Sequence, residues 1–452
     1  MWLELVDNLI IIASLLTPLA LLTLGATMLL TRYRSEKLVH VLLSSTFLGS
    51  LILVLGAGFG LFMSGESSRL IDLGPLIQLG SYHLELVLLV DPLSIIMLTL
   101  NFILCGVVGY FSSKYLHRDE GYYRFFMMML FLATGVELAV IAAGFDVMFI
   151  GWELLGISSA LLVAFFYRRQ APTQNAFWTY GIYRLTDIGL LSAIIALHHA
   201  TDDVLMSNLG LLGSSSLVVG ALFIFGAMGK GGLFPFTGWL PRAMEGPTSS
   251  SAIFYGALSV HMSPFLLLRL SPLIEAHKEL QIAIAALGVL TLLHASMVGR
   301  VQTDAKSTMA YASAAQIGIM WVWVALGWYE LTIIHMVGHA IARSWQILRA
   351  PSFIQERRIL ERMQGARVNH DRHVERFMPA KLERFLYHIA LQRWFTDDFL
   401  LVVVHTLKKG VLWINSADTQ LFQALTGSDK PATSTEEESS VEIQAKKSTS
   451  KA

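Results

Sequence analysis

Apolar residues recur along the chain in blocks long enough to cross a lipid bilayer, separated by short polar loops. A helix needs about 20 apolar residues to span the hydrocarbon core. Eleven blocks meet this requirement, near residues 9–31, 39–63, 92–112, 124–144, 146–167, 176–198, 216–240, 250–270, 281–299, 306–327 and 329–349. The pattern predicts an all-α polytopic membrane protein with about eleven transmembrane helices.

Two of these blocks carry residues that break helices. The seventh contains GKGGLFPFTGWLP, and the eighth contains Pro264. Helix breaks at membrane depth are tolerated only where they are buried in protein or line a water-filled cavity. We therefore expect a broken seventh helix and an interrupted eighth helix, as transporters use to build ion sites.

Basic residues fall mainly in alternate loops, which predicts an orientation. The predicted outside loops contain only Arg69 and Lys278, and the outer connection 199–212 is acidic. The predicted inside loops contain Arg32, Arg34 and Lys37, Lys114, Arg118 and Arg124, Arg168 and Arg169, Arg242, Arg300, and the run 349–372. The N-terminus is therefore expected outside and the C-terminus in the cytoplasm, with the chain in a cell inner membrane.

The remaining segments do not read as spans. Partial alternation in SYHLELVLLV predicts a hairpin within 66–91, on the outer face. Residues 351–394 are charged and helical in pattern, which favours the cytoplasmic surface. The apolar run 399–404 is short and flanked by charges, which favours an interfacial helix over a twelfth span.

Composition supports a membrane protein and excludes several activities. Charged residues make up 15% of the chain, against about 25% in soluble domains. The single cysteine, Cys105, excludes an internal disulfide and a cysteine-built zinc or iron–sulfur site. No phosphate loop, dinucleotide fingerprint or nucleophile elbow is present. We expect no cofactor in this chain, no nucleic-acid partner and no catalytic site.

Glu153 and Lys230 are the most informative residues because each lies inside an apolar block. A charged side chain at bilayer depth costs roughly 2.5–3.5 kcal/mol on insertion scales. Burial disfavours the charged form of both an acid and an amine, so such a pair can exchange a proton. This pattern indicates a proton or ion relay; a lysine that snorkels from a helix end is the alternative for Lys230.

Other ionisable residues extend this hypothesis along the chain. His261 suits a proton shuttle, although a hydrogen-bonded packing histidine would look the same. Lys306 lies at the start of the tenth block, where it is either an interfacial anchor or an inward relay residue. Spaced four apart, His335, His339 and Arg343 share one helix face. No third ligand accompanies the two histidines, so a hydrated proton path is favoured over a metal site.

Three further charges accompany Glu153. Arg184 and Asp187 are three residues apart, which allows an internal ion pair on one helix. That pair is either structural or an electrostatic modulator of Glu153. Glu137 is a second intramembrane acid and a candidate relay member.

Five ordered motifs within residues 90–350 resemble the antiporter-like membrane subunits of respiratory complex I and of Mrp-type antiporters. They are GWELLG, RLTD, GKGGLFPFTGWLPRAMEGPT, TDAKSTMAYASAAQIG and HMVGHAIAR. The resemblance implies two inverted five-helix repeats, each with a broken helix. It also implies a proton path from Glu153 through Lys230 toward Lys306 in the second repeat.

The chain departs from that family in three ways. Complex I subunits of this type have a histidine where Tyr255 stands and a lysine where Arg343 stands. Their second repeat continues into another broken helix, which we expect to be missing here. We divide the chain accordingly into two N-terminal helices plus the hairpin (1–91), a first repeat (92–270), a truncated second repeat (271–350), a cytoplasmic or interfacial helical segment (351–427) and a disordered tail (428–452).

This shorter form, with SAIFYGALSVH in the eighth block, resembles the DabB family of inorganic-carbon accumulation systems. That resemblance implies a large cytoplasmic DabA-like partner, related to β-carbonic anhydrases and holding zinc. Cation flow, of H⁺ or Na⁺, would then drive one-way hydration of CO2 to bicarbonate.

Three other functions remain open from the sequence. They are a proton-pumping subunit of a complex I-like or membrane hydrogenase assembly, a component of a multi-subunit Na⁺/H⁺ antiporter, and a structural membrane anchor. The anchor leaves the buried Glu153 and Lys230 unexplained.

Overall fold

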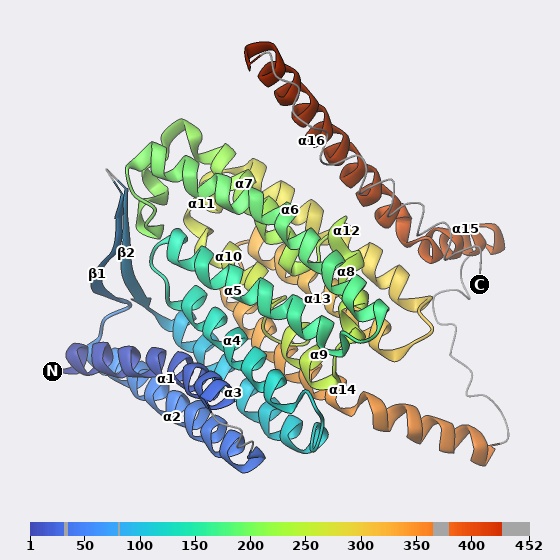
Figure 1. Ribbon diagram of the computed structural model, residues 1–452, viewed down its shortest axis with the longest axis horizontal. Coiled ribbons are helices and arrows are strands. Elements are labelled where there is room, and N and C mark those ends of the chain that lie inside the picture. Colours follow the sequence, from blue (N-terminus) through green and yellow to red (C-terminus); the bar gives the residue numbers. More distant parts are fainter. Residues whose placement is uncertain (31–34, 80–81, 365–378, 427–452) are drawn as a thin grey trace. The chain divides into compact units, whose positions relative to one another are not determined.

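The computed structural model describes residues 1–30, 35–79, 82–364 and 379–426 (Figure 1). It separates into two compact units, Met1–Trp394 and Phe395–Ala452. The long helices of the first unit are α1 (Trp2–Leu30), α2 (Glu36–Ser64), α3 (Pro92–Tyr115), α4 (Tyr122–Ile141), α5 (Phe145–Val163), α6 (Gln170–Thr201), α7 (Ser216–Gly231), α12 (Lys278–Arg300), α13 (Ala305–Ala325) and α14 (Tyr329–Gln364). The predicted tail 428–452 lies outside the described residues.

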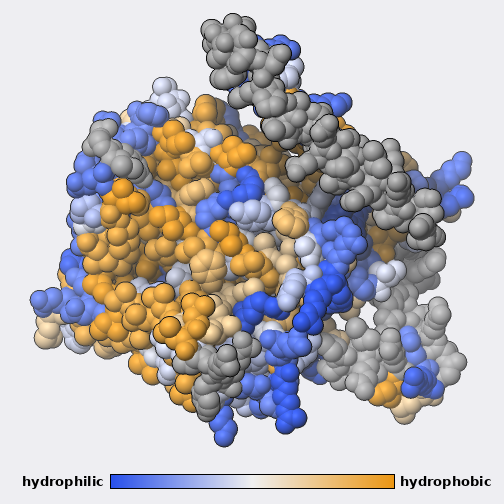
Figure 2. Space-filling view, viewed as in Figure 1, coloured by the Kyte–Doolittle hydropathy of each residue, from blue (hydrophilic) through white to orange (hydrophobic). Residues whose placement is uncertain are grey.

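The helices confirm a polytopic membrane protein. Among the described residues, ten helical segments are long and apolar enough to cross a membrane. Figure 2 shows hydrophobic side chains over a broad area around α1, where Leu15, Leu19 and Leu22 are exposed. A soluble protein rarely exposes so large an apolar surface, whereas a lipid-facing helix must.

The interruptions expected in the seventh and eighth blocks are confirmed. After α7 the chain forms η4 (Phe236–Gly238), α8 (Trp239–Arg242) and η5 (Ala243–Glu245). The eighth block divides into α9 (Thr248–Phe254) and α10 (Met262–Arg269), followed by α11 (Ser271–Ala276). The break falls before His261 rather than at Pro264, because proline is compatible with the first turn of a helix.

Two C-terminal helices are longer than the apolar runs that predicted them. α14 continues past the expected span 329–349 to Gln364 as one helix of 36 residues, which agrees with the helical pattern predicted after residue 350. α14 is not among the ten candidate spans. The eighth block is not among them either, because it is divided into helices shorter than a span. The run 399–404 is part of α16 (Thr396–Thr426), whose segment Arg393–Asp418 is long and apolar enough to cross a membrane. Interfacial placement of α16 therefore remains a prediction.

The hairpin expected within 66–91 is confirmed. β1 (Arg69–Leu79) pairs antiparallel with β2 (Tyr82–Val90), with an irregularity around Pro75 where the ladder loses a donor. β2 also forms a bridge to Ala142 at the end of α4. The hairpin thus covers one end of the bundle.

Loops assigned to the same side of the membrane lie together. Tyr115, Phe166, Glu245 and Lys306, which follow or precede four different spans, line one cavity of about 400 Å³. At the opposite end, the loop after α4 pairs with Leu205 in the loop after α6. This grouping agrees with the alternation of loops, while the side that faces the cytoplasm remains a prediction.

A buried ion pair fixes the start of α3 to α10. Asp91 caps α3 by accepting from the Ser94 backbone N–H at 2.8 Å, and Pro92 occupies the first helical position. Two guanidinium nitrogens of Arg269 donate hydrogen bonds to the same carboxylate, at 2.5 and 3.0 Å. Burial alone would raise the pKa of Asp91, but the hydrogen bonds and charge of Arg269, with Ser94, hold it below its usual value.

We expect Asp91→Asn to destabilise the protein by about 3–5 kcal/mol, because it leaves the buried Arg269 uncompensated. The carboxylate has a lowered folded pKa, so its contribution is present above the unfolded value and is lost as the pH falls through the folded pKa. The difference in Tm between wild type and variant should therefore narrow once the pH drops below 3.8, the ordinary value. Glu120→Gln, which breaks the exposed Arg168–Glu120 pair, should leave Tm unchanged.

Candidate functional site

The break in the seventh helix places Lys230 at the centre of the first unit. α7 stops at Gly231 because Gly232 adopts a left-handed conformation, with φ of 62°, that side-chain-bearing residues rarely tolerate. Lys230 thus lies in the last turn of the helix, where the helix dipole favours a cation. Its side chain has no exposed surface, and its Nζ has no hydrogen-bond partner among the described residues.

Aromatic rings surround the Lys230 amino group. Nζ lies 4.9 Å from the ring centroid of Trp152 on α5 and 4.5 Å from that of Tyr183 on α6. Trp239 of α8 packs edge-on against Tyr183 and donates to the Gly229 carbonyl at 2.8 Å. Ring faces stabilise a cation without accepting its protons in hydrogen bonds. All three protons of a charged Lys230 therefore remain available for transfer.

Arg184 joins the two acids nearest to Lys230. It forms ion pairs with Glu153 and, at 2.8 Å, with Asp187. Asp187 also accepts from Trp152 Nε1 at 2.6 Å, so both its oxygens are occupied. Lys230 interacts electrostatically with both carboxylates. The structure thus brings Glu153, Arg184, Asp187 and Lys230 into one neighbourhood, and their roles in a relay remain a prediction.

The four groups divide into fixed and exchangeable members. Asp187 is held by two donors, and Arg184 bridges both acids. Glu153, by contrast, has one buried oxygen, Oε1, without a hydrogen-bond partner among the described residues. This oxygen can take a proton while the other, Oε2, stays in contact with Arg184, although the neutral carboxyl no longer forms an ion pair. Glu153 and Lys230 are therefore the two groups of this cluster equipped to exchange a proton.

Gly156 provides the space that the Lys230 amino group occupies. A Cβ at this position would lie 3.0 Å from Nζ and 3.5 Å from a guanidinium nitrogen of Arg184. We expect Gly156→Ala to move the amine and to lower proton transfer about tenfold, because small misplacements of a reacting group are costly. Gly181→Ala on α6 is the matched control, since nothing lies within 4 Å of its Cβ. Proton flux in reconstituted vesicles is measured for both variants. Equal flux would contradict the expectation that a Cβ at position 156 displaces the Lys230 amine.

A second polar chain joins the interrupted eighth helix to α14. His261 Nε2 lies 3.0 Å from His339 Nδ1, and His261 Nδ1 contacts the Ala257 carbonyl. His335 accepts from Trp323 at 3.2 Å and lies 2.8 Å from Gln316 Oε1. The structure therefore brings the three candidate histidines together.

Hydrogen-bond partners assign the protons of these histidines in their neutral forms. The Ala257 carbonyl can only accept, so His261 carries its proton on Nδ1 and accepts from His339 at Nε2. The Trp323 indole can only donate, so His335 donates from Nε2. The bonds run in one direction, from His339 to the Ala257 carbonyl. Nε2 of His339 has no hydrogen-bond partner among the described residues. A proton that arrives there can be passed on as far as Nε2 of His261, because the Ala257 carbonyl accepts a hydrogen bond but does not take up a proton.

Arg343 lies beside the histidine chain, whereas Lys306 lies apart from it. Arg343, one turn after His339, has a buried Nε without a partner among the described residues, and it repels positive charge on His339. Lys306 donates to the carbonyls of Met244 and Gly246, at 3.2 and 3.4 Å, where the broken helix ends. No described contact joins Lys306 directly to a histidine.

Glu137 lies apart from the cluster. Gly135 and Ala139, two residues before and after it, approach Gly151 of α5. Glu137 consequently faces away from α5, beside Thr17 of α1, with its carboxylate fully buried. The relay role suggested for Glu137 thus lacks a neighbour among the other candidates and remains a prediction.

Comparison with known proteins identifies the family of this chain. A family model described as NADH:quinone oxidoreductase/Mrp antiporter, TM, matches residues 143–373, just over half of the chain. The chain belongs to this antiporter-like family. A second model, NADH-Ubiquinone oxidoreductase (complex I), chain 5 N-terminus, matches residues 76–126. Membership confirms the resemblance to antiporter-like subunits that the five ordered motifs predicted.

Relatives within the antiporter-like family are longer than this chain. NAD(P)H-quinone oxidoreductase subunit 5 from the chloroplast of Carpenteria californica is 32% identical over 61% of this chain and 38% of its own length. Chain 5 from Synechocystis sp. is 30% identical over 61% of this chain and 42% of its own length. The chain thus spans about two fifths of the length of these relatives.

A solved structure supports the fold. The Mrp complex from Dietzia sp. DQ12-45-1b superposes with a TM-score of 0.62 at 22% identity, covering 84% of this chain and 40% of the other. At this identity the similarity demonstrates an antiporter-like fold. It leaves the transported ion of this chain open.

Several residues of this antiporter-like site are absent from the sequence-based candidates. His294 of α12 is buried and lies 2.9 Å from Thr237 in the broken helix. Its position within the apolar block TLLHASM could have revealed it. Trp152 and Tyr183 could not be found this way, because aromatic residues in a span look like ordinary core.

A metal site is not indicated by the described part of the chain. Within residues 1–30, 35–79, 82–364 and 379–426, no group of three histidine, cysteine, aspartate or glutamate side chains is arranged to hold an ion.

Proposed function

We propose that this chain conducts protons as the energy-coupling membrane subunit of a larger complex. The observation that carries the proposal is Lys230, a fully buried amine beside the Arg184-bridged acids that has no hydrogen-bond partner in the described part of the chain. A membrane protein gains no stability from such a group, so a transport role accounts for its presence. In this role Lys230 is the amine that changes its protonation state during each cycle.

Uptake of a proton adds one positive charge to the cluster, the transfer from Glu153 to Lys230 leaves the charge unchanged, and release removes it. A proton taken up on the vacant Glu153 oxygen neutralises that acid and leaves Arg184 with Asp187 as its partner. Transfer of the same proton to neutral Lys230 restores the carboxylate and forms an ammonium ion between two aromatic rings. Release of the proton from Lys230 toward the second repeat returns Glu153 and Lys230 to their starting protonation states.

The histidine chain is the proposed continuation. Gly231, next to Lys230, packs so closely on Ser263 that a Cβ would lie 2.4 Å from its hydroxyl oxygen. Ser263 follows His261 by two residues, so α7 and the histidine chain are neighbours. In this proposal Lys230 releases its proton toward the His261–His339 pair, and the fixed charge of Arg343 opposes its accumulation there.

The partner that we propose is a soluble, zinc-containing DabA-like protein of an inorganic-carbon pump. The support comes from the sequence SAIFYGALSVH, in which the fully buried Tyr255 packs against Trp239 of the broken helix. In this assembly the C-terminal segment lies on the cytoplasmic side. The basic run 349–372 is the predicted docking segment, of which residues 365–372 lie outside the described residues.

A redox-driven pump is the second candidate. Its support is the similarity to chloroplast and cyanobacterial NAD(P)H-quinone oxidoreductase subunits. In this case the same Glu153–Lys230 pair would respond to electron transfer in neighbouring subunits.

Copurification in mild detergent, followed by mass spectrometry and metal analysis, distinguishes the candidates. One large zinc protein in constant ratio to this chain supports the inorganic-carbon pump. Copurifying subunits that carry iron–sulfur clusters and flavin would overturn the inorganic-carbon pump and support the redox-driven pump. Several small membrane subunits without either indicate an Mrp-type antiporter and overturn both.

A further inference from the structure

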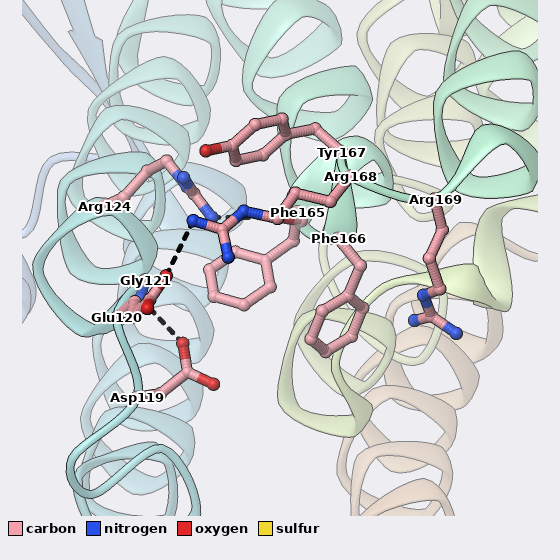
Figure 3. Close-up of a pocket in the computed structure, with 9 residues that line it drawn as sticks. All are labelled: Asp119, Glu120, Gly121, Arg124, Phe165, Phe166, Tyr167, Arg168 and Arg169. Atoms are coloured by element: carbon pink, nitrogen blue, oxygen red, sulfur yellow. Dashed lines mark hydrogen bonds and ion pairs between the residues drawn. The ribbon is translucent and has the colours of Figure 1, made fainter.

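Two cavities meet at one end of α4, outside the proton path. The first, of about 320 Å³, is here called the arginine pocket because Arg124, Arg168 and Arg169 line it (Figure 3). The second, of about 830 Å³, is here called the apolar groove. Glu120 and Arg124 line both, so the two cavities are adjacent.

Arg124 is held rigidly at the junction. It lies in the first turn of α4 and donates to the Phe165 carbonyl at 3.0 Å. Its guanidinium also covers the rings of Phe165 and Tyr167, at 4.9 and 4.8 Å from their centroids. Its Nε is buried and has no hydrogen-bond partner within the residues that the structure describes. Arg124 is therefore a preorganised cation with an unused donor.

Arg168 is an adjustable member of the same pocket. It pairs with Glu120 at 2.9 Å, and the two side chains are 74% and 82% exposed. Such exposed pairs are weak and open readily. A phosphate diester offers Arg168 a stronger, charge-assisted partner at the same place. Asp119, which also lines the pocket, is already engaged by the Gly121 backbone N–H at 2.7 Å (Figure 3).

The adjoining groove is apolar along its length. α1 contributes Leu22, Gly25 and Leu29, and α4 contributes Met127 and Phe131. Gly25 removes a side chain from the groove floor, where a Cβ would lie 3.8 Å from Met127. Methionine and leucine side chains adapt to flexible hydrocarbon. The groove thus suits acyl chains whose headgroup reaches the arginine pocket.

We propose that the arginine pocket and the apolar groove form one binding site for an anionic phospholipid. Arg124 and Arg168 hold the phosphate, and the groove between α1 and α4 holds the acyl chains. Fixed positive charge at the headgroup end distinguishes this site from lipid that merely surrounds the protein. A bound lipid would attach α1 to the α4–α5 region, next to the helix that carries Glu153.

Native mass spectrometry of the full chain tests the site. The detergent-purified protein is titrated with phosphatidylglycerol or with phosphatidylcholine of the same acyl chains. We expect preferential retention of phosphatidylglycerol, and a loss of preference of about fivefold for each arginine removed. Arg168→Gln tests one arginine without disturbing a buried contact, and Arg124→Gln with Arg168→Gln tests both. Lys278→Gln, an exposed lysine elsewhere, is the matched control and should retain the preference.

Two further arms separate a lipid from a free anion. Gly25→Leu should lower retention of phosphatidylglycerol by filling the groove, while leaving the arginines in place. Inorganic phosphate alone should not compete at equal concentration. Equal retention of both lipids by wild type, unchanged preference in Arg168→Gln, or full competition by inorganic phosphate would each overturn the proposal.

Discussion

Lys230→Met should abolish proton transfer through the chain and leave the protein folded. Methionine has nearly the shape of lysine, so the packing against Trp152 and Tyr183 is retained. The substitution removes a buried nitrogen without a hydrogen-bond partner, which is neutral or favourable for stability. We expect Tm within about 3 °C of wild type.

The loss of function should be large because no described neighbour can replace the amine. Arg184 cannot release a proton under physiological conditions, and Asp187 is held by Trp152 and Arg184. We expect proton flux to fall roughly 100-fold or more, the range measured for removal of a proton-transfer group. Lys278→Met is the control, because this exposed lysine lies outside the cluster. Flux at wild-type level in Lys230→Met would remove Lys230 from the path.

Glu153→Gln should lower proton flux strongly and Glu137→Gln should not, although both replace an intramembrane acid. Glutamine at 153 keeps the volume but cannot bind and release the proton, and it loses the ion pair with Arg184. We expect a loss of roughly 100-fold in proton flux. Glutamine at 137 changes a carboxyl that faces Thr17, away from the cluster, and should retain most of the flux.

The pair of variants also controls for insertion and folding. Each removes one carboxyl from the membrane interior, so the cost of insertion changes in the same direction. Proton flux and expression level are measured for both. Comparable loss in the two variants would assign Glu137 to the path and show that the separation of the two acids does not matter for transport.

The site residues that could be found from the sequence are those whose chemical character differs from that of their neighbours in the chain. Glu153, Lys230 and the histidines are detectable because ionisable residues are rare in apolar blocks. The break after Gly231 is detectable because glycine and proline cluster there. The transmembrane helices followed from the same apolar blocks, and the charged segment after residue 350 was predicted to be helical. That α14 runs through to Gln364 as one helix was not predicted, because a change from apolar to charged residues does not show whether a helix ends there.

Residues that share the character of their surroundings remained hidden. Trp152 and Tyr183 form the walls around Lys230, but a buried aromatic residue in a span has no distinguishing pattern. The pairing of His261 with His339 joins positions 78 residues apart, which no periodicity within one helix can indicate. The same limit applies to Asp91 and Arg269, whose pairing depends on how α3 and α10 pack.

Proton flux into liposomes under an imposed potassium diffusion potential tests the central claim most directly. The purified complex that contains this chain is reconstituted with a pH-sensitive dye inside, and Na⁺ is omitted. The account predicts acidification by the wild type that is lost in both Lys230→Met and Glu153→Gln. Flux that requires Na⁺, or that is the same in wild type and both variants, would contradict proton conduction through this pair.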